Sequence, residues 1–142
     1  MILISHRGNI SGIDKQSENK PDYILNALNI GYNVEVDIWH HKNELYLGHD
    51  EPIILLPEEL LEYKDKLWFH AKNLDALTKL EKLSVHYFWH QNDDITITSK
   101  GYWWTYPGKK LFNNSICVLP EKFNQDISSC AGYCSDVIGK YI

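Results

Sequence analysis

One stretch decides how this chain is expected to fold: Asn33-Val34-Glu35-Val36-Asp37-Ile38. Because side chains alternate across a strand, its apolar residues share one face, and Glu35 and Asp37 share the other. A run rich in β-branched residues is typical of a buried strand, where two neighbouring carboxylates are costly unless a cation lies between them. Oxygen ligands suit Mg²⁺ or Ca²⁺, so the stretch predicts a divalent metal site. From this stretch alone, the alternative is a half-exposed antiparallel strand with its acidic face in water.

Strands and helices are expected to alternate through the first half of the chain. Pro21 and Gly31 bound an apolar helical pattern, since proline is tolerated in a first helical turn and glycine commonly ends a helix. This alternation is typical of βα units and a parallel sheet. The expected elements are a strand at 2–5, a helix at 21–30, strands at 33–38 and 44–48, a short helix at 57–64, a strand at 67–71 and a helix at 74–83.

The pattern changes after residue 84, where turn-rich links separate short extended pieces. These pieces lie at 85–90, 95–98, 102–106, 116–119 and near 133–138. About eight strands that begin as βα units predict a TIM-type (β/α) barrel, although the usual barrel needs about 250 residues. We therefore expect one domain over residues 1–142, a compact or incomplete TIM-type barrel with few helices in its second half. A homodimer could cover the strands that lack helices.

Composition excludes some classes of function. The net charge of −5 argues against general binding of nucleic acid, because phosphate backbones attract basic surfaces. No apolar run approaches the length of a membrane span, and the chain opens directly into a strand without a leader pattern. The three cysteines are an odd count without metal-ligand spacing, so we expect reduced, packed thiols and a cytoplasmic protein.

Several separated motifs carry a resemblance to a known family. In chain order they are His6-Arg7-Gly8, Ser17-Glu18-Asn19, Ala27-Leu28-x-x-Gly31, Glu35-x-Asp37 and Gly48-His49-Asp50. This order resembles the glycerophosphodiester phosphodiesterase family, which belongs to the phospholipase-C-like phosphodiesterases and is built on a TIM-type barrel. The resemblance covers residues 3–50, with shorter matches at Lys72, at Trp104-Thr105 and at residues 132–136.

The resemblance implies metal-dependent hydrolysis of a small, glycerophosphodiester-like phosphodiester. His6 and His49 would be the acid–base pair, a task for groups that titrate near neutrality. Arg7 would hold the phosphate with its planar guanidinium, and Lys72 would add a point charge beside it. In the family, a glycerol hydroxyl next to the phosphorus can attack first and leave a cyclic phosphate that water then opens.

The resemblance also implies that Glu35 and Asp37 bind the cation, but the third ligand differs. Where the family carries Glu-x-Lys, this chain reads His70-Ala71-Lys72. By strand alternation, His70 still points to the place of that ligand. An imidazole removes one negative charge and shifts preference toward softer metals. The expected cofactor is therefore one divalent cation, Mg²⁺ or Ca²⁺, with Mn²⁺ or Zn²⁺ as the alternatives that His70 introduces.

Three further residues have two interpretations each. Glu18 either occupies the acidic position of the family or helps to cap the following helix. Asp50 either orients His49 or caps a turn, and Trp104 either lines the pocket as an apolar wall or packs in the core. Two other functions also stay open. One is a catalytically degenerate barrel that binds a phosphorylated sugar, headgroup or nucleotide-sugar, and the other is an interaction module that uses exposed aromatic residues.

Overall fold

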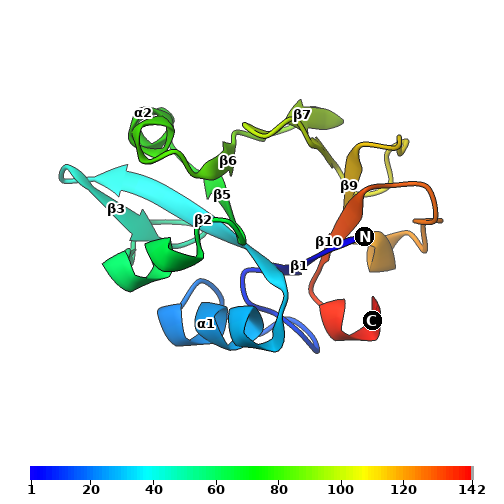
Figure 1. The fold of residues 1–142 in the computed structure, drawn as a ribbon, viewed down its shortest axis with the longest axis horizontal. Helices are drawn as coiled ribbons and strands as arrows, with labels where there is room; N and C mark the ends of the chain where they lie inside the picture. Colours follow the sequence, from blue (N-terminus) through cyan, green and yellow to red (C-terminus); the bar gives the residue numbers. More distant parts are fainter. Residues whose placement is uncertain (142) are drawn as a thin grey trace.

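Ten strands form one mixed sheet that curls into a half-barrel (Figure 1). The structure is a computed structural model that describes residues 1–141. The strands are β1 (Ile2–His6), β2 (Asn33–His41), β3 (Glu44–Leu47), β4 (Ile54–Leu55), β5 (Leu67–Ala71), β6 (His86–Phe88), β7 (Ile95–Ile97), β8 (Trp103–Thr105), β9 (Ser115–Val118) and β10 (Gly132–Ser135). The helices are α1 (Pro21–Ile30), α2 (Leu74–Leu83) and the 3-10 helices η1 (Glu58–Tyr63), η2 (Pro120–Lys122) and η3 (Ile138–Tyr141).

Seven of the strands run parallel, in the order β6-β5-β2-β1-β10-β9-β8. The first and last strands are neighbours in this order, with Ile4 opposite Cys134. The remaining strands are antiparallel additions: β3 pairs with the end of β2, β4 with β3, and β7 with β8. Parallel neighbours bring their carboxyl ends to the same edge of the sheet, and this edge carries the site described below.

The expected TIM-type barrel is wrong. Such a barrel alternates a helix with every parallel strand, but among the described residues only α1 and α2 are α-helices. The connections after β6 contain turns and the single 3-10 helix η2, so no layer of helices covers that half of the sheet. In addition, β3, β4 and β7 pair antiparallel, which makes the sheet mixed. The second half does contain few helices, but they belong to a mixed half-barrel sheet and not to the predicted TIM-type barrel.

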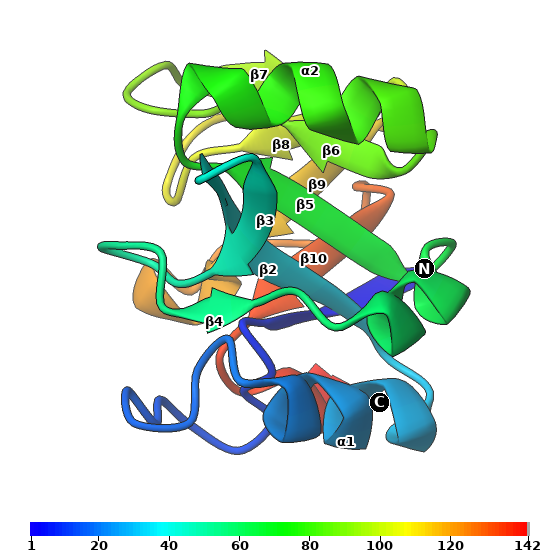
Figure 2. The ribbon, with the colours of Figure 1, turned by 90° about the vertical axis from the view of Figure 1, so that its left-hand side faces the viewer.

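The alternation of β2 separates two packing environments. Val34, Val36 and Ile38 belong to the larger apolar cluster, which packs the sheet against α1 and α2. In the view of Figure 2, α2 lies above β2 and β5, and α1 lies below them. Glu35 and Asp37 point to the other, concave face, as alternation requires.

The concave side of the sheet is apolar and aromatic deeper in the curl. There Trp68 lies 6.0 Å from Trp104 between ring centroids, and Ile4 and Ile116 complete the same cluster. The three cysteines are buried and free, as expected for reduced thiols. Among residues 1–141, no helix is both long and apolar enough to cross a membrane.

Candidate functional site

Polar side chains from four parallel strands meet at the carboxyl edge of the sheet. The strand register places His6 of β1 opposite Glu35 of β2, and Asp37 of β2 opposite His70 of β5. Asp136 follows the end of β10 on the other side of β1. These side chains surround a cavity of about 460 Å³, which is large enough for a small organic ligand.

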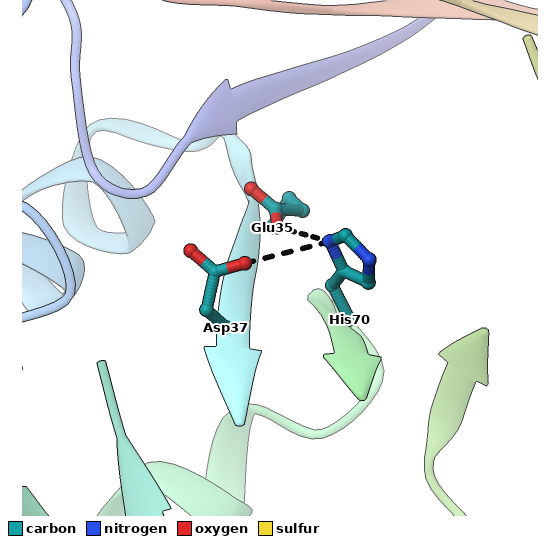
Figure 3. A group of neighbouring side chains, drawn as sticks. All are labelled: Glu35, Asp37 and His70. Carbon is teal, nitrogen blue, oxygen red and sulfur yellow. Dashed lines mark ion pairs between the residues drawn. The ribbon is translucent and has the colours of Figure 1, made fainter. Parts of the chain in front are cut away.

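Glu35, Asp37 and His70 form a tight cluster at the floor of this region. The Nδ1 atom of His70 lies 3.7 Å from Glu35 Oε1 and 3.4 Å from Asp37 Oδ1. Figure 3 shows both carboxylates directed at this ring nitrogen. One ligand atom from each residue lies within 4.8 Å of the other two, a spacing that allows all three to contact one ion.

Three oxygen atoms of this cluster are buried without a hydrogen-bond partner among the described residues. They are both carboxylate oxygens of Glu35 and Oδ1 of Asp37. Glu35 is 1% exposed and Asp37 is 0% exposed, so these side chains are closed off from bulk solvent. Buried, unsatisfied charged groups are strongly unfavourable unless a counter-charge is present. The three oxygens therefore fit a bound cation.

The hydrogen bonding of His70 suits a metal ligand as well. Its Nε2 lies 3.0 Å from the backbone oxygen of His90, which can only accept, so Nε2 carries the hydrogen. That bond leaves Nδ1 to face the carboxylates, as in metal sites where the second ring nitrogen of a histidine is bound to a carbonyl. Without a metal, burial lowers the pKa of His70, but Asp37 and Glu35 outweigh it and raise this pKa to about 9. The two carboxylates thus attract positive charge strongly.

Asp37 is held so that only one of its oxygens faces the cluster. Asn19 Nδ2 donates to Asp37 Oδ2 at 2.9 Å, and the Asp37 amide donates to Asn19 Oδ1 at 3.0 Å. Arg7 Nε lies 3.0 Å from the same Oδ2. Despite burial, the ring of His70 and these neighbours keep the pKa of Asp37 below its usual range. Oδ1 is therefore the oxygen that remains for a cation.

Arg7 is held at the site by its backbone and by Glu18. Its backbone is left-handed, with φ 57°, and its amide donates to the Glu35 carbonyl at 2.9 Å. Few residues other than glycine adopt this conformation, and such positions are often found at functional sites. Its guanidinium also reaches Glu18 Oε2 at 3.2 Å. The side chain is thus fixed beside the carboxylate cluster.

His6 pairs with Asp136, a carboxylate that was not predicted for the site. Its Nδ1 lies 2.6 Å from Asp136 Oδ1, and Asn9 Nδ2 donates to the same oxygen at 2.9 Å. The other ring nitrogen, Nε2, faces the cluster and lies 3.6 Å from Glu35 Oε2. Burial lowers the pKa of His6, but Asp136 and Glu35 more than offset it, so the pKa is raised overall.

His49 stands at the rim of the cavity on the loop after β3. Its side chain is 42% exposed, and its Nδ1 lies 2.8 Å from Asp50 Oδ1. The loop is attached through Gly48, whose amide donates to the Asp37 carbonyl at 3.2 Å and whose carbonyl accepts from Trp39 Nε1 at 2.7 Å. His49 therefore approaches the cavity from the solvent side, whereas His6 approaches it from the sheet.

The structure brings nearly all of the residues predicted for the site together. His6, Arg7, Glu18, Glu35, His49, His70, Lys72 and Trp104 line the main cavity. Asp37 lies in the same cluster, and Asp50 lines a neighbouring cavity of about 380 Å³ that shares His49. Trp104 is 3% exposed, and its ring centroid lies 4.4 Å from that of Phe88. It therefore packs in the core and also lines the cavity.

Asp136, Asn9, Asn19 and Lys122 were not predicted for the site, although Asn19 lay within a quoted motif. The available signal for Asp136 was its position directly after the last strand, just as Arg7 directly follows β1 and Lys72 directly follows β5. Lys122 lines the cavity from η2, and no motif marks it.

The cavity is rich in cationic side chains despite the negative charge of the whole chain. Arg7, Lys15, Lys72 and Lys122 all line it. Lys72 Nζ lies 4.0 Å from Asp37 Oδ1, which places this ammonium beside the carboxylate cluster. Several cations around one cavity favour an anionic ligand, and the arginine fork suits a phosphate or carboxylate group.

Comparison with known proteins found no match to the chain among family models, curated proteins or solved structures.

Proposed function

We propose that this protein binds one divalent cation at Glu35, Asp37 and His70 and hydrolyses a phosphodiester of the glycerophosphodiester kind. One observation carries the proposal: three buried carboxylate oxygens lack a hydrogen-bond partner within residues 1–141, in a cavity that cationic side chains also line. A cation would satisfy the oxygens, and the surrounding charges suit a phosphate that contacts the same cation. Mg²⁺, Ca²⁺ and Mn²⁺ all accept oxygen ligands, and Zn²⁺ also accepts an imidazole.

When bound, the cation would neutralise charge on the phosphoryl oxygens and polarise the P–O bonds. The chain itself supplies the other requirements of the reaction. Arg7 and Lys72 hold the phosphate oxygens and thereby orient the phosphorus. Because Asp136 occupies Nδ1 of His6, the Nε2 atom is the one that faces the cavity and can exchange a proton.

We assign the two histidines to opposite sides of the phosphorus. His6 takes the proton from the attacking hydroxyl, which belongs either to a neighbouring carbon of the substrate or to water. As the new O–P bond forms, the bond from phosphorus to the alcohol breaks, and His49 gives a proton to the departing oxygen. The exposure of His49 at the rim supports this assignment, because the alcohol must leave toward solvent.

The test is an assay of the purified protein against a panel of glycerophosphodiesters with Mg²⁺, Ca²⁺ or Mn²⁺ added. We expect metal-dependent release of the alcohol, loss of release with a chelator, and a fall of about 100-fold or more in His6→Ala and His49→Ala. His41→Ala is the matched control, because His41 is an exposed histidine outside the cavity. Wild-type rates in both site variants would refute the acid–base pair.

Metal binding is measured separately from turnover. At a metal concentration 100 times Kd, binding stabilises the fold by about 2.7 kcal/mol. We therefore expect the melting temperature to rise on addition of metal in the wild type but not in Glu35→Gln. Glu51→Gln, in an exposed loop, should retain the shift. Metal binding without any turnover would favour the degenerate function, in which the cavity only binds a phosphorylated ligand.

A further inference from the structure

Lys122 lines the cavity on the opposite side of β1 from the carboxylate cluster. It ends η2, which follows β9, and two strands, β10 and β1, lie between β9 and β2. A phosphate bound to the cation of Glu35 and Asp37 would lie on the β2 side of β1, whereas η2 packs on the β10 side. Lys122 therefore faces a different part of any ligand that fills the cavity.

The turn that carries Lys122 is fixed to the sheet. Leu119 immediately before η2 has φ 49° and ψ 56°, a left-handed conformation that is rare for leucine. Its amide donates to the Cys134 carbonyl at 2.8 Å. Glu121 accepts hydrogen bonds from Ser135 Oγ at 3.0 Å and from the Asp136 amide at 3.1 Å. These contacts hold the backbone of Lys122 at the edge of the cavity, next to the strand that supplies Asp136.

The charges around the cavity exceed the needs of one phosphodiester. Arg7 is paired with Glu18, and His6 is paired with Asp136. A divalent cation would offset the two remaining carboxylates, Glu35 and Asp37. That leaves three lysines on the cavity wall: Lys15, Lys72 and Lys122.

Two of these lysines are free to meet a ligand. Lys15 and Lys122 form no ion pair within the described residues, and the contact of Lys72 with Asp37 is at the long distance of 4.0 Å. A phosphodiester carries a single negative charge, so positive charge remains once it has bound. A phosphate monoester carries about −1.5 to −2 near pH 7, which matches that remainder better than a carboxylate does.

We propose that the substrate is a phosphodiester in which the esterified alcohol nearer His6 also carries a phosphate group, and that Lys122 binds this second phosphate. The inference rests on the proposed function, because it takes the carboxylate cluster as the site of the scissile phosphodiester. Lys122 is then a specificity-determining residue, which selects the alcohol without contact to the reacting bond. A lysine suits this role as a point charge for a phosphate.

The test compares the binding of two analogues of glycerophosphoglycerol in which a methylene group replaces the bridging oxygen, so that neither can be hydrolysed. One analogue carries a phosphate on its distal glycerol, and the other carries a free hydroxyl there. Calorimetry in the presence of Mg²⁺ gives both dissociation constants. We expect the wild type to bind the phosphorylated analogue about tenfold more tightly or better, and to lose this preference as salt is raised.

Substitutions of Lys122 test whether this residue causes the preference for the phosphorylated analogue. Lys122→Gln should weaken binding of the phosphorylated analogue about tenfold and change the dissociation constant of the other analogue by less than about twofold. Lys122→Arg should retain tight binding of the phosphorylated analogue. Lys64→Gln is the matched control, because Lys64 is an exposed lysine outside the cavity. Equal binding of the two analogues by the wild type, binding of neither, or equal weakening of both by Lys122→Gln would overturn the inference. A third analogue with a distal carboxylate that bound as tightly would overturn the choice of phosphate.

Failure of this inference is distinguishable from failure of the proposed function. If the preference and its loss in Lys122→Gln are observed but no diester is hydrolysed, the second-phosphate site stands and the cavity is a binding site only. If simple glycerophosphodiesters are hydrolysed with metal but the analogues bind equally, the hydrolase stands and Lys122 does not select the alcohol.

Discussion

The Nδ1 atom of His6 lies 2.6 Å from an Asp136 carboxylate oxygen, although the two residues are 130 positions apart in the chain. The contact is possible because β1 and β10 are parallel neighbours whose ends meet at the cavity. It fixes the orientation of the imidazole and leaves Nε2 toward Glu35. In the proposed reaction, a carboxylate in this position would also stabilise the protonated ring that forms when His6 accepts a proton.

Asp136→Asn tests this positioning role. The amide retains the shape of the side chain but removes the charge, so the imidazolium is less stable and the ring orientation is less well fixed. We expect kcat to fall by roughly 100-fold with a small change in KM, measured on a diester that the wild type hydrolyses. Asp65→Asn, an exposed aspartate away from the cavity, should behave as wild type. Full activity in Asp136→Asn would show that His6 does not depend on this contact.

His70→Glu tests the choice of metal. A third carboxylate adds a negative, hard oxygen ligand in place of a softer nitrogen. We expect the affinity for Mg²⁺ and Ca²⁺ to rise by about tenfold relative to that for Zn²⁺, measured by competition calorimetry with all three ions. His41→Glu makes the same change of charge on the surface and should leave the order of affinities as in the wild type. An unchanged order in His70→Glu would mean that this residue does not contact the ion.

Local patterns in the sequence were sufficient for most elements of the first half. Pro21 and Gly31 bound the first helix at the predicted residues, because their backbone preferences act within a single turn. The third predicted helix, 74–83, also has the observed bounds. The alternation in β2 correctly predicted that Glu35 and Asp37 share a face, since strand alternation needs no knowledge of distant residues.

The architecture could not be obtained in the same way, because it depends on which strands pair. A short link at residues 98–102 joins β7 to β8, and Gly101 within it has φ 87°. A tight link with a glycine in this conformation favours an antiparallel hairpin, and that signal was available but was interpreted only as a turn. The pairing of β1 with β10 leaves no local signature in the sequence, so nothing near Asp136 indicates that it lies beside His6.

Gly48→Ala tests whether the loop after β3 positions His49. A Cβ atom at Gly48 would overlap the backbone oxygen of Glu51, so the loop must shift. A displacement of about 1 Å at a reacting group can reduce a rate by about 100-fold, and we expect kcat to fall by that order. Gly12→Ala is a matched control, because Gly12 has the same φ of 151° but open space around its Cβ position. Equal losses in the two variants would assign the effect to backbone strain instead.

The burial of His86 leads to a prediction about stability and pH, and this prediction does not rest on the proposed function. The side chain is buried beside Trp68, with 3.9 Å between ring centroids, and its Nε2 lies 2.7 Å from Thr98 Oγ1. Burial, together with the charge of Lys100, lowers the pKa of His86 to about 4. In the unfolded chain its pKa is about 6.5. Between these values, the unfolded state binds a proton that the folded state does not.

The sign of the effect follows from that difference. The His86 contribution to stability is fully present above pH 6.5 and is lost as pH falls toward 4, by at most about 1.4 kcal/mol per pH unit. His86→Gln removes this titration, so its free energy of unfolding should fall less steeply than that of the wild type. Urea denaturation at several pH values from 7.5 to 4 (about one unit apart) measures both slopes. His41→Gln, which removes an exposed histidine, should retain the wild-type slope. Parallel slopes for His86→Gln and the wild type would show that His86 takes up its proton at the same pH in the folded and unfolded states.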